Sequence, residues 1–195
     1  VAIFVINLLF KLYHNGCRAL WYDEIISLKN TFLDFGHIKH ESEWDANPPF
    51  YYYLLWIWTK MFGVSEPGLR SMSAFFSALS ACFIYLTAAR LSNHLQALVI
   101  TILFSLHPLL FYYSQEARGY SVVIFLISVL LYFLFLFLHT NQTGYLIGIG
   151  LLNFLLIYTH YLTFPVIVFI CIYLCFQVRR NIVQVLLLVW AMPLA

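Results

Sequence analysis

The stretch SVVIFLISVLLYFLFLFL, residues 121–138, decides the fold, because it carries no charged side chain over its whole length. A transmembrane helix needs roughly 17–25 predominantly apolar residues. Inside a bilayer every backbone N–H and C=O must be satisfied within the chain, so a run of this kind forms a helix. The stretch therefore predicts a helix that crosses a membrane.

Apolar runs of similar character recur along the chain. We expect spans at about 1–13, 71–89, 95–113, 121–138, 145–161, 165–178 and 182–195. The chain begins at Val1 and ends inside an apolar run, so we expect an N-terminal fragment whose C-terminal part is missing. Residues 1–195 are thus predicted to form part of one membrane-embedded domain, an all-α polytopic transmembrane helix bundle.

The composition supports lipid as the main solvent of the chain. Of 195 residues, 63% are hydrophobic and 9% are charged, whereas soluble domains carry about 25% charged residues. The net charge is +2, and no basic patch with interleaved aromatic residues occurs. Membrane lipid is therefore an expected partner, and nucleic acid is not.

One apolar segment, 48–63, is too short for an ordinary span, opens with two prolines and carries Lys60. If it does not cross, Arg90, Arg179 and Arg180 fall on one side, away from every acid. The acids on the other side are Asp23, Glu24, Asp34, Glu41, Glu43, Asp45, Glu66 and Glu116. Positive charge favours the cytoplasmic side, so 48–63 is predicted to be an interfacial helix on the outer face.

Two polar stretches of the long outer loop can carry chemistry. The first is Trp21-Tyr22-Asp23-Glu24, whose adjacent carboxylates suit a general base or a cation ligand; the alternative is a solvated helix start. The second leads from the acids around Asp45 into Asn47-Pro48-Pro49 and a run of three tyrosines that includes Tyr52. Those tyrosines can equally form an interfacial aromatic belt.

A second outer turn, Ser114–Tyr120, holds Glu116 and Arg118 between two apolar runs. Arginine presents a planar, permanently charged fork that suits phosphate, although an arginine that snorkels to the interface beside Glu116 explains the pattern too. Arg70, at the outer start of a span, presents the same choice. His160 ends another span on this side, where a hydrogen-bonded interface histidine is the simpler explanation.

As an ordered set, several short motifs resemble a known family. They are Trp21-Tyr-Asp-Glu24, Asn47-Pro-Pro-Phe-Tyr-Tyr-Tyr-Leu-Leu55, Phe62-Gly-Val-Ser-Glu66, Leu69-Arg-Ser-Met-Ser-Ala74, His107-Pro108, Tyr112-Tyr-Ser-Gln-Glu-Ala-Arg-Gly-Tyr120 and Tyr158-Thr-His-Tyr161. The chain thereby resembles the membrane glycosyltransferases of the protein O-mannosyltransferase and aminoarabinose transferase superfamily, the GT-C fold. It is most similar to the bacterial members described as dolichyl-phosphate-mannose-protein mannosyltransferase-like.

The resemblance implies an inverting transferase that moves a sugar from a polyprenyl-phosphate carrier to a lipid, glycan or protein acceptor. It implies a multi-pass protein of the bacterial plasma membrane with its site on the outer face. Asp23 is the implied base, with Glu24 beside it, and Arg118 lies near the carrier phosphate, helped by Arg70. Glu24, Asp45 or Glu116 would orient groups around Asp23 or bind a divalent cation, and the choice stays open. Asn47 stands where family members commonly have histidine, which weakens a metal or acid/base role there.

A transporter or flippase for a lipid-linked or small substrate is the competing class. It predicts ionisable residues deep in the spans, broken helices and inverted repeats. The apolar runs are nearly free of charge, and no repeat is found. A structural protein without activity would explain the composition, but not why Asp23-Glu24 and Glu116-Arg118 share one predicted face.

Overall fold

The computed structural model describes residues 1–39 and 47–177, and these residues are helical with no β-strand among them. The α-helices are α1 (Ala2–Leu12), α2 (Tyr22–Thr31), α4 (Phe50–Phe62), α5 (Glu66–Leu91), α6 (His94–Leu106), α7 (Pro108–Ser114), α8 (Tyr120–Thr140), α9 (Thr143–Thr159) and α10 (Phe164–Gln177). Two short 3-10 turns, η1 (Phe35–His37) and η2 (Tyr161–Thr163), complete the set. The predicted all-α fold is confirmed, while the run 182–195 and the residue Asp45 lie outside the described residues.

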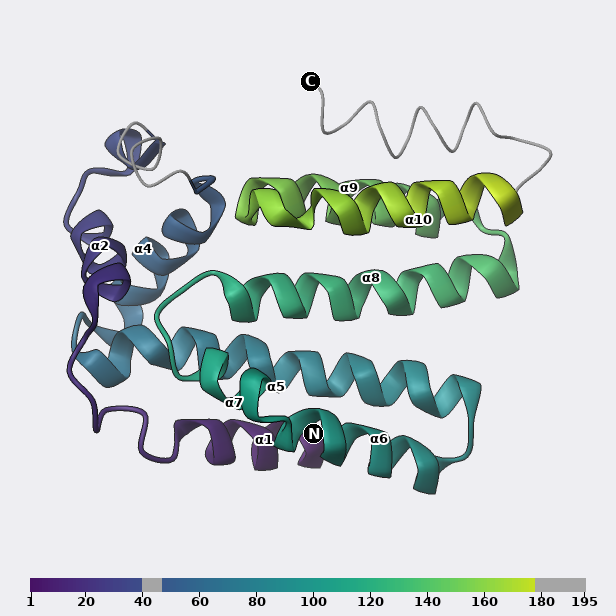
Figure 1. The fold of residues 1–195 in the computed structure, drawn as a ribbon, viewed down its shortest axis with the longest axis horizontal. Helices are drawn as coiled ribbons and strands as arrows, with labels where there is room; N and C mark the ends of the chain where they lie inside the picture. The colour runs from purple at the N-terminus through teal and green to yellow at the C-terminus, as the bar shows by residue number, and fades with distance from the viewer. Residues whose placement is uncertain (40–46, 178–195) are drawn as a thin grey trace.

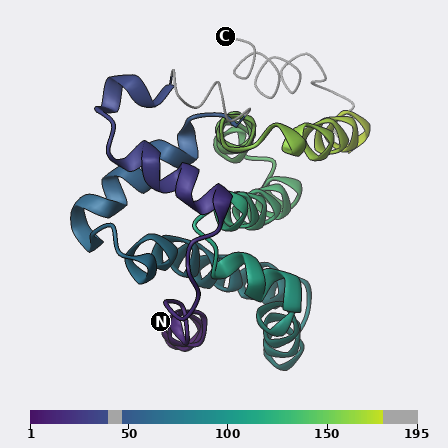
Figure 2. The ribbon, with the colours of Figure 1, turned by 60° about the vertical axis from the view of Figure 1, so that its left-hand side comes forward.

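The long helices run along one common direction and stack in layers, whereas α2 and α4 lie together at one end (Figure 1). In the stack α8 packs between α5 and α9, and α1 and α6 pack against α5. Turned by 60°, the view keeps α2 and α4 side by side across that end (Figure 2). The loops that connect α7 to α8 and α9 to η2 reach the same end, which therefore gathers segments from four parts of the chain.

Helix α5 is the centre of the bundle and contacts α1, α4, α6, α7 and α8. Its buried positions are rich in small side chains: Ser73, Ala74, Ser77, Ala78, Ser80, Ala81 and Ala88. Small residues let helices approach closely, which is how helices associate where lipid removes the usual hydrophobic drive. The composition of α5 thus explains why it can be surrounded on several sides.

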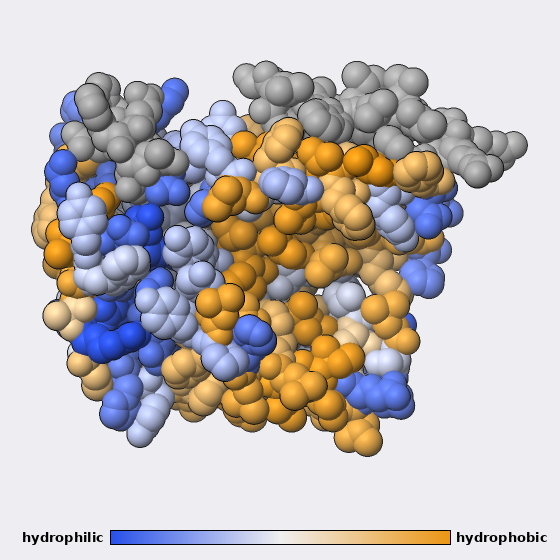
Figure 3. Space-filling view, in the orientation of Figure 1, coloured by the Kyte–Doolittle hydropathy of each residue, from blue (hydrophilic) through white to orange (hydrophobic). Residues whose placement is uncertain are grey.

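Two of the described helices, α5 and α8, are long and apolar enough to cross a membrane. The pair α6–α7 would add a third span if the two helices are counted together. Figure 3 shows apolar residues along the middle of the bundle and hydrophilic residues toward both ends, most of all at the end that carries α2 and α4. An apolar belt between polar ends is typical of the surface of an integral membrane protein.

The run 95–113 was expected to be one helix, and the structure corrects this. It breaks into α6 and α7, which meet at an angle of 63° at His107 and Pro108. Proline lacks an N–H and clashes with the preceding turn, so it ends α6 and starts α7. The amine of Lys11 donates to the carbonyl of Ser105, 2.8 Å away, and so satisfies an acceptor near the end of α6.

The segment 48–63 forms α4, whose 13 residues are too few to cross a bilayer. Gly63, at φ 78°, ends the helix in a backbone conformation that favours glycine. The hydroxyl of Ser65 then accepts a hydrogen bond from the N–H of Gly68, and Pro67 occupies the first turn of α5. Placement of α4 at the membrane interface agrees with its length and stays a prediction.

Candidate functional site

The first turn of α2 sets two adjacent carboxylates in different surroundings. The backbone N–H of Trp21 donates to the Glu24 carboxylate at 3.4 Å, a contact typical of a helix start. Acidic groups are also stabilised there by the helix dipole. Because successive helical residues differ by about 100° in direction, Glu24 is fully buried whereas the side chain of Asp23 is 32% exposed.

Glu24 forms a two-point ion pair with Arg70 of α5. The Arg70 Nε and Nη2 atoms lie 2.8 and 2.7 Å from the two carboxylate oxygens. The remaining guanidinium N–H groups donate to the carbonyls of Asn15, Arg18 and Ala19. All five donors of Arg70 are therefore used within the protein. These contacts argue for a structural part, and the predicted part of Arg70 in holding a carrier phosphate stays a prediction.

Glu24 also holds the turn between α7 and α8. Its Oε1 atom accepts from the backbone N–H of Ala117 at 2.8 Å. Burial raises the pKa of the Glu24 carboxyl, but the bonds from Arg70 and Ala117 outweigh that effect and hold the pKa below its ordinary value. With both oxygens hydrogen-bonded within the protein and its side chain buried, Glu24 positions its neighbours, and a direct catalytic part for it stays a prediction.

Asp23 and Arg118 meet at the edge of this buried cluster. The Asp23 Oδ2 atom lies 3.8 Å from the Arg118 Nη2 atom, and Nη1 donates to the backbone carbonyl of Asp23 at 3.4 Å. The structure thus brings the two predicted polar stretches to the same end of the bundle. Asp23 remains partly exposed, so its carboxylate can be approached by a ligand that binds Arg118.

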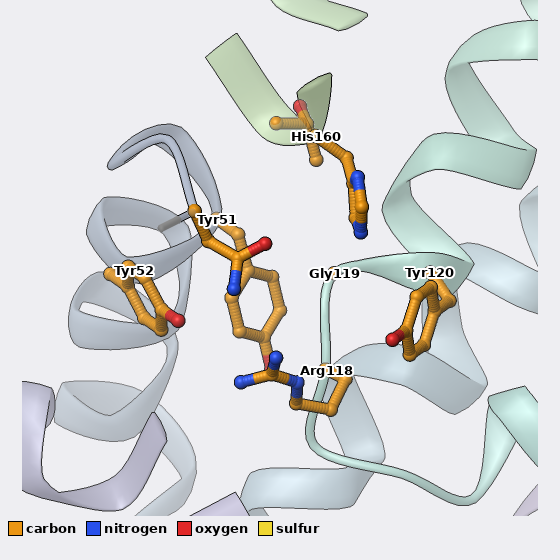
Figure 4. A pocket seen from close by; sticks show the side chains of 8 residues that line it. Tyr51, Tyr52, Arg118, Gly119, Tyr120 and His160 are labelled. Carbon is orange, nitrogen blue, oxygen red and sulfur yellow. The ribbon is translucent and has the colours of Figure 1, made fainter. Parts of the chain in front are cut away.

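Arg118 points into a narrow pocket between α4, η2 and the start of α8 (Figure 4). The pocket is lined by Asn47, Tyr51, Tyr52, Arg118, Gly119, Tyr120, Thr159 and His160. The ring of Tyr51 is directed at the Arg118 guanidinium, and the rings of Tyr120 and His160 lie 5.7 Å apart. A Cβ on Gly119 would lie 3.5 Å from Tyr51, so the turn passes close to α4. Of the predicted residues, Arg118, Tyr52 and His160 share this pocket, and Asp23 flanks it.

Glu116 lies on the other side of the same turn. It is 3% exposed, and its backbone carbonyl accepts a hydrogen bond from the hydroxyl of Ser73. Burial raises the pKa of the Glu116 carboxyl, an effect only partly offset by a hydrogen bond from the Tyr112 hydroxyl. Glu116 lines a second pocket with Arg18, Trp21 and Gln115, and not the pocket that contains Arg118.

Several groups that build the site cannot be recognised from the types of residue in the sequence. The carbonyls of Asn15, Arg18 and Ala19 and the N–H of Ala117 are backbone groups, which every residue has. Tyr51 and Tyr120 stand within the motifs quoted above, but their residue type does not distinguish them from the tyrosines of an aromatic belt. Among the described residues, no group of three or more His, Cys, Asp or Glu side chains is arranged to hold a metal ion.

Comparison with known proteins gives one match. The family model described as dolichyl-phosphate-mannose-protein mannosyltransferase matches residues 46–195. No curated protein and no solved structure matches the chain. The matched part contains Tyr52, Arg70, Glu116, Arg118 and His160. Asp23 and Glu24 precede it, so the contacts described above are what join these two acids to the matched part.

Proposed function

Since the chain belongs to the dolichyl-phosphate-mannose-protein mannosyltransferase family, whose members are membrane glycosyltransferases that use polyprenyl-phosphate sugars, we propose that Asp23 and Arg118 form the reaction centre. The observation that carries this proposal is the 3.8 Å approach of the Asp23 carboxylate to the Arg118 guanidinium. A group that binds phosphate and a group that accepts a proton are the two that such a transfer requires.

Arg118 binds the phosphate that links the sugar to its lipid carrier. Its guanidinium is permanently charged and, at 10% side-chain exposure, largely shielded from water. Shielding strengthens its attraction for an anion, and most strongly for the charge that grows on the phosphate as the sugar departs. Arg118 therefore stabilises the leaving group more in the transition state than in the bound donor.

Asp23 takes the proton of the acceptor hydroxyl. The acceptor oxygen forms a bond with the anomeric carbon while the bond from that carbon to the phosphate oxygen breaks. The electron pair of the broken bond stays on the polyprenyl phosphate, and the proton of the hydroxyl moves to Asp23. One displacement of this kind inverts the configuration at the anomeric carbon.

The prenyl chain of the donor approaches from α4 and α9. A cavity of about 560 Å³ lies there, lined mainly by aromatic and apolar side chains from the two helices. Asn47 borders both this cavity and the pocket of Arg118, so the two are neighbours. The Arg118 pocket itself holds only about 10 Å³, the space of about one water molecule. A phosphate there requires the aromatic side chains that line the pocket to move aside.

The reaction centre faces the outer side of the membrane in this proposal. Among the described residues, Asp23, Glu24, Asp34, Glu66 and Glu116 belong to the end formed by α2, α4 and the start of α5. Arg90 occupies the last turn of α5, at the opposite end. Arg18, Lys29, Lys60, Arg70 and Arg118 also belong to the end that carries the acids, so the charges do not choose the side, and the outward orientation rests on the family resemblance.

A transfer assay tests the proposed function. Membranes that contain the intact protein are incubated with radiolabelled polyprenyl-phosphate mannose, and release of the sugar from its carrier is followed. Release above that of membranes without the protein is expected. A protein that only moves the lipid across the membrane would leave the bond between mannose and phosphate intact, and that result would reject the transferase.

A further inference from the structure

A second polar cavity of about 260 Å³ lies on the far side of the turn that carries Arg118. It is lined by Arg18, Ala19, Trp21, Glu24, Arg70, Tyr112, Gln115 and Glu116. Glu24 and Arg70 are bonded to each other, so five other polar and aromatic side chains, those of Arg18, Trp21, Tyr112, Gln115 and Glu116, are the ones that can meet a ligand. Cavities for drug-sized ligands hold about 300–1,000 Å³, so this one suits a smaller molecule, such as one sugar ring. The mechanism proposed above uses none of these five side chains.

The two pockets are separated by one turn of backbone. Gln115 and Glu116 line the second cavity, whereas Arg118 and Gly119 line the first. Between them, Ala117 is fully buried and its N–H is held by Glu24. The first turn of α2 is divided in the same way, because Trp21 lines the second cavity and Asp23 contacts Arg118. Asp23 lines neither pocket, but it stands in sequence between Trp21 and Glu24 of the second cavity and contacts Arg118 of the first, so it is adjacent to both.

The lining of the second cavity fits a carbohydrate. The rings of Trp21 and Tyr112 are both partly exposed, and flat aromatic faces pack against the C–H face of a sugar ring. Glu116 and Gln115 are at most 8% exposed, and their carboxylate and amide groups suit the hydroxyls of such a ring. The guanidinium of Arg18 lies 5.7 Å from the Tyr112 ring and adds donors at the rim.

A peptide acceptor fits this cavity less well. Extended peptides are usually bound through backbone hydrogen bonds along a sheet edge or in a long groove. The described residues contain no strand, and the cavity is short. A hydroxyl on a sugar needs only a ring-sized site with convergent polar groups, which is what the five side chains provide.

We infer that this cavity binds the acceptor, and that the acceptor is a carbohydrate whose hydroxyl is directed toward Asp23. The inference rests on the proposed function, since an acceptor exists only if Asp23 and Arg118 catalyse transfer. It adds the chemical class of the acceptor and assigns the donor and acceptor to opposite sides of the residues 115–119 turn.

Saturation-transfer NMR on the intact protein in lipid nanodiscs with polyprenyl monophosphate tests the inference. The probes are the methyl glycosides of mannose, glucose and N-acetylglucosamine, and N-acetyl-threonine amide represents a peptide hydroxyl. At least one glycoside is expected to receive saturation at its ring protons. Trp21→Ala should weaken its binding about 2- to 10-fold, the usual worth of an aromatic contact. Glu116→Gln, which keeps the shape of the side chain, should weaken it as well.

Tyr22→Ala is the matched control, because Tyr22 neighbours Trp21, is 74% exposed and lines neither pocket. Binding in this variant should equal that of the wild type. Three results would overturn the inference. They are saturation of the threonine amide alone, no saturation of any glycoside, and glycoside binding that is unchanged in both Trp21→Ala and Glu116→Gln. Cleavage of the labelled donor is measured in the same sample. Cleavage without glycoside binding defeats the inference alone, whereas binding without cleavage defeats the proposed function and the acceptor role together.

Discussion

The carboxylate of Asp23 lies 3.8 Å from the guanidinium of Arg118, although the two residues are 95 positions apart in the chain. The contact depends on a buried framework: Glu24 holds Arg70 and the N–H of Ala117. One acid of the adjacent pair thus builds the site, while the other stays accessible.

Arg118→Ala should lower the rate of donor cleavage by about 10²–10³, the usual effect of removing one group that stabilises developing negative charge. Arg118→Lys should retain part of the rate, because lysine keeps the charge and loses the planar fork. Initial rates with labelled polyprenyl-phosphate mannose measure both variants. Arg90→Lys, at the opposite end of α5, is the control and should be unchanged. Equal rates in the wild type and Arg118→Ala would remove Arg118 from the mechanism.

Glu24→Gln should destabilise the fold by about 3–5 kcal/mol, because it leaves the buried charge of Arg70 without its partner. Thermal unfolding in detergent measures the change. The double variant Glu24→Gln with Arg70→Met removes both charges and should recover part of the loss. If Glu24→Gln unfolds at the wild-type midpoint, the ion pair does not hold the framework.

Acid should weaken the same framework. The pKa of Glu24 is lowered in the folded state, so the carboxylate contributes stability that is fully present above its ordinary pKa of 4.5. That contribution is lost as the pH falls through the lower folded-state pKa. At pH values below 4.5, the thermal unfolding midpoint of the wild type should therefore fall more steeply with decreasing pH than that of Glu24→Gln. Parallel curves for the two proteins would contradict the role of Glu24.

Gly68→Ala should destabilise the junction of α4 and α5. A Cβ at this position would lie 2.7 and 2.9 Å from the carbonyl oxygens of Phe62 and Gly63, which are backbone atoms that cannot easily move. The expected cost is about 1–3 kcal/mol. Gly144→Ala is the control, since nothing lies within 4 Å of its Cβ, and alanine should be neutral or favourable in that helix. Equal midpoints for both variants would show that the junction is loosely packed.

Much of the fold could be predicted from the length of the apolar runs, because a run such as 121–138 permits only a helix in lipid. The break in 95–113 was missed even though Pro108 signals it, because the run was judged by its length and hydropathy. The expected spans were described as nearly free of charge, but Lys11 lies in the first of them. Its side chain is 1% exposed and is hydrogen-bonded to the carbonyl of Ser105.

For the site, the sequence could predict several of the residues but not their contacts with one another. Asp23, Arg118, Tyr52 and His160 were singled out by residue type, and they meet at one end of the bundle. The partners of a charged side chain depend on the fold, and the bonds of Arg70 within the protein could not be predicted for that reason. Its three carbonyl partners are backbone groups without any sequence signal.

Donor cleavage by Asp23→Asn tests the central claim most directly. Asparagine keeps the shape of the side chain but cannot accept the proton, so release of mannose from polyprenyl phosphate should fall by about 10²–10⁴. Expression and the thermal midpoint should be unchanged, because Asp23 lies outside the buried framework. Asp34→Asn, at a side chain that is 95% exposed, should behave as the wild type. Wild-type release of mannose by the folded Asp23→Asn protein would contradict the account.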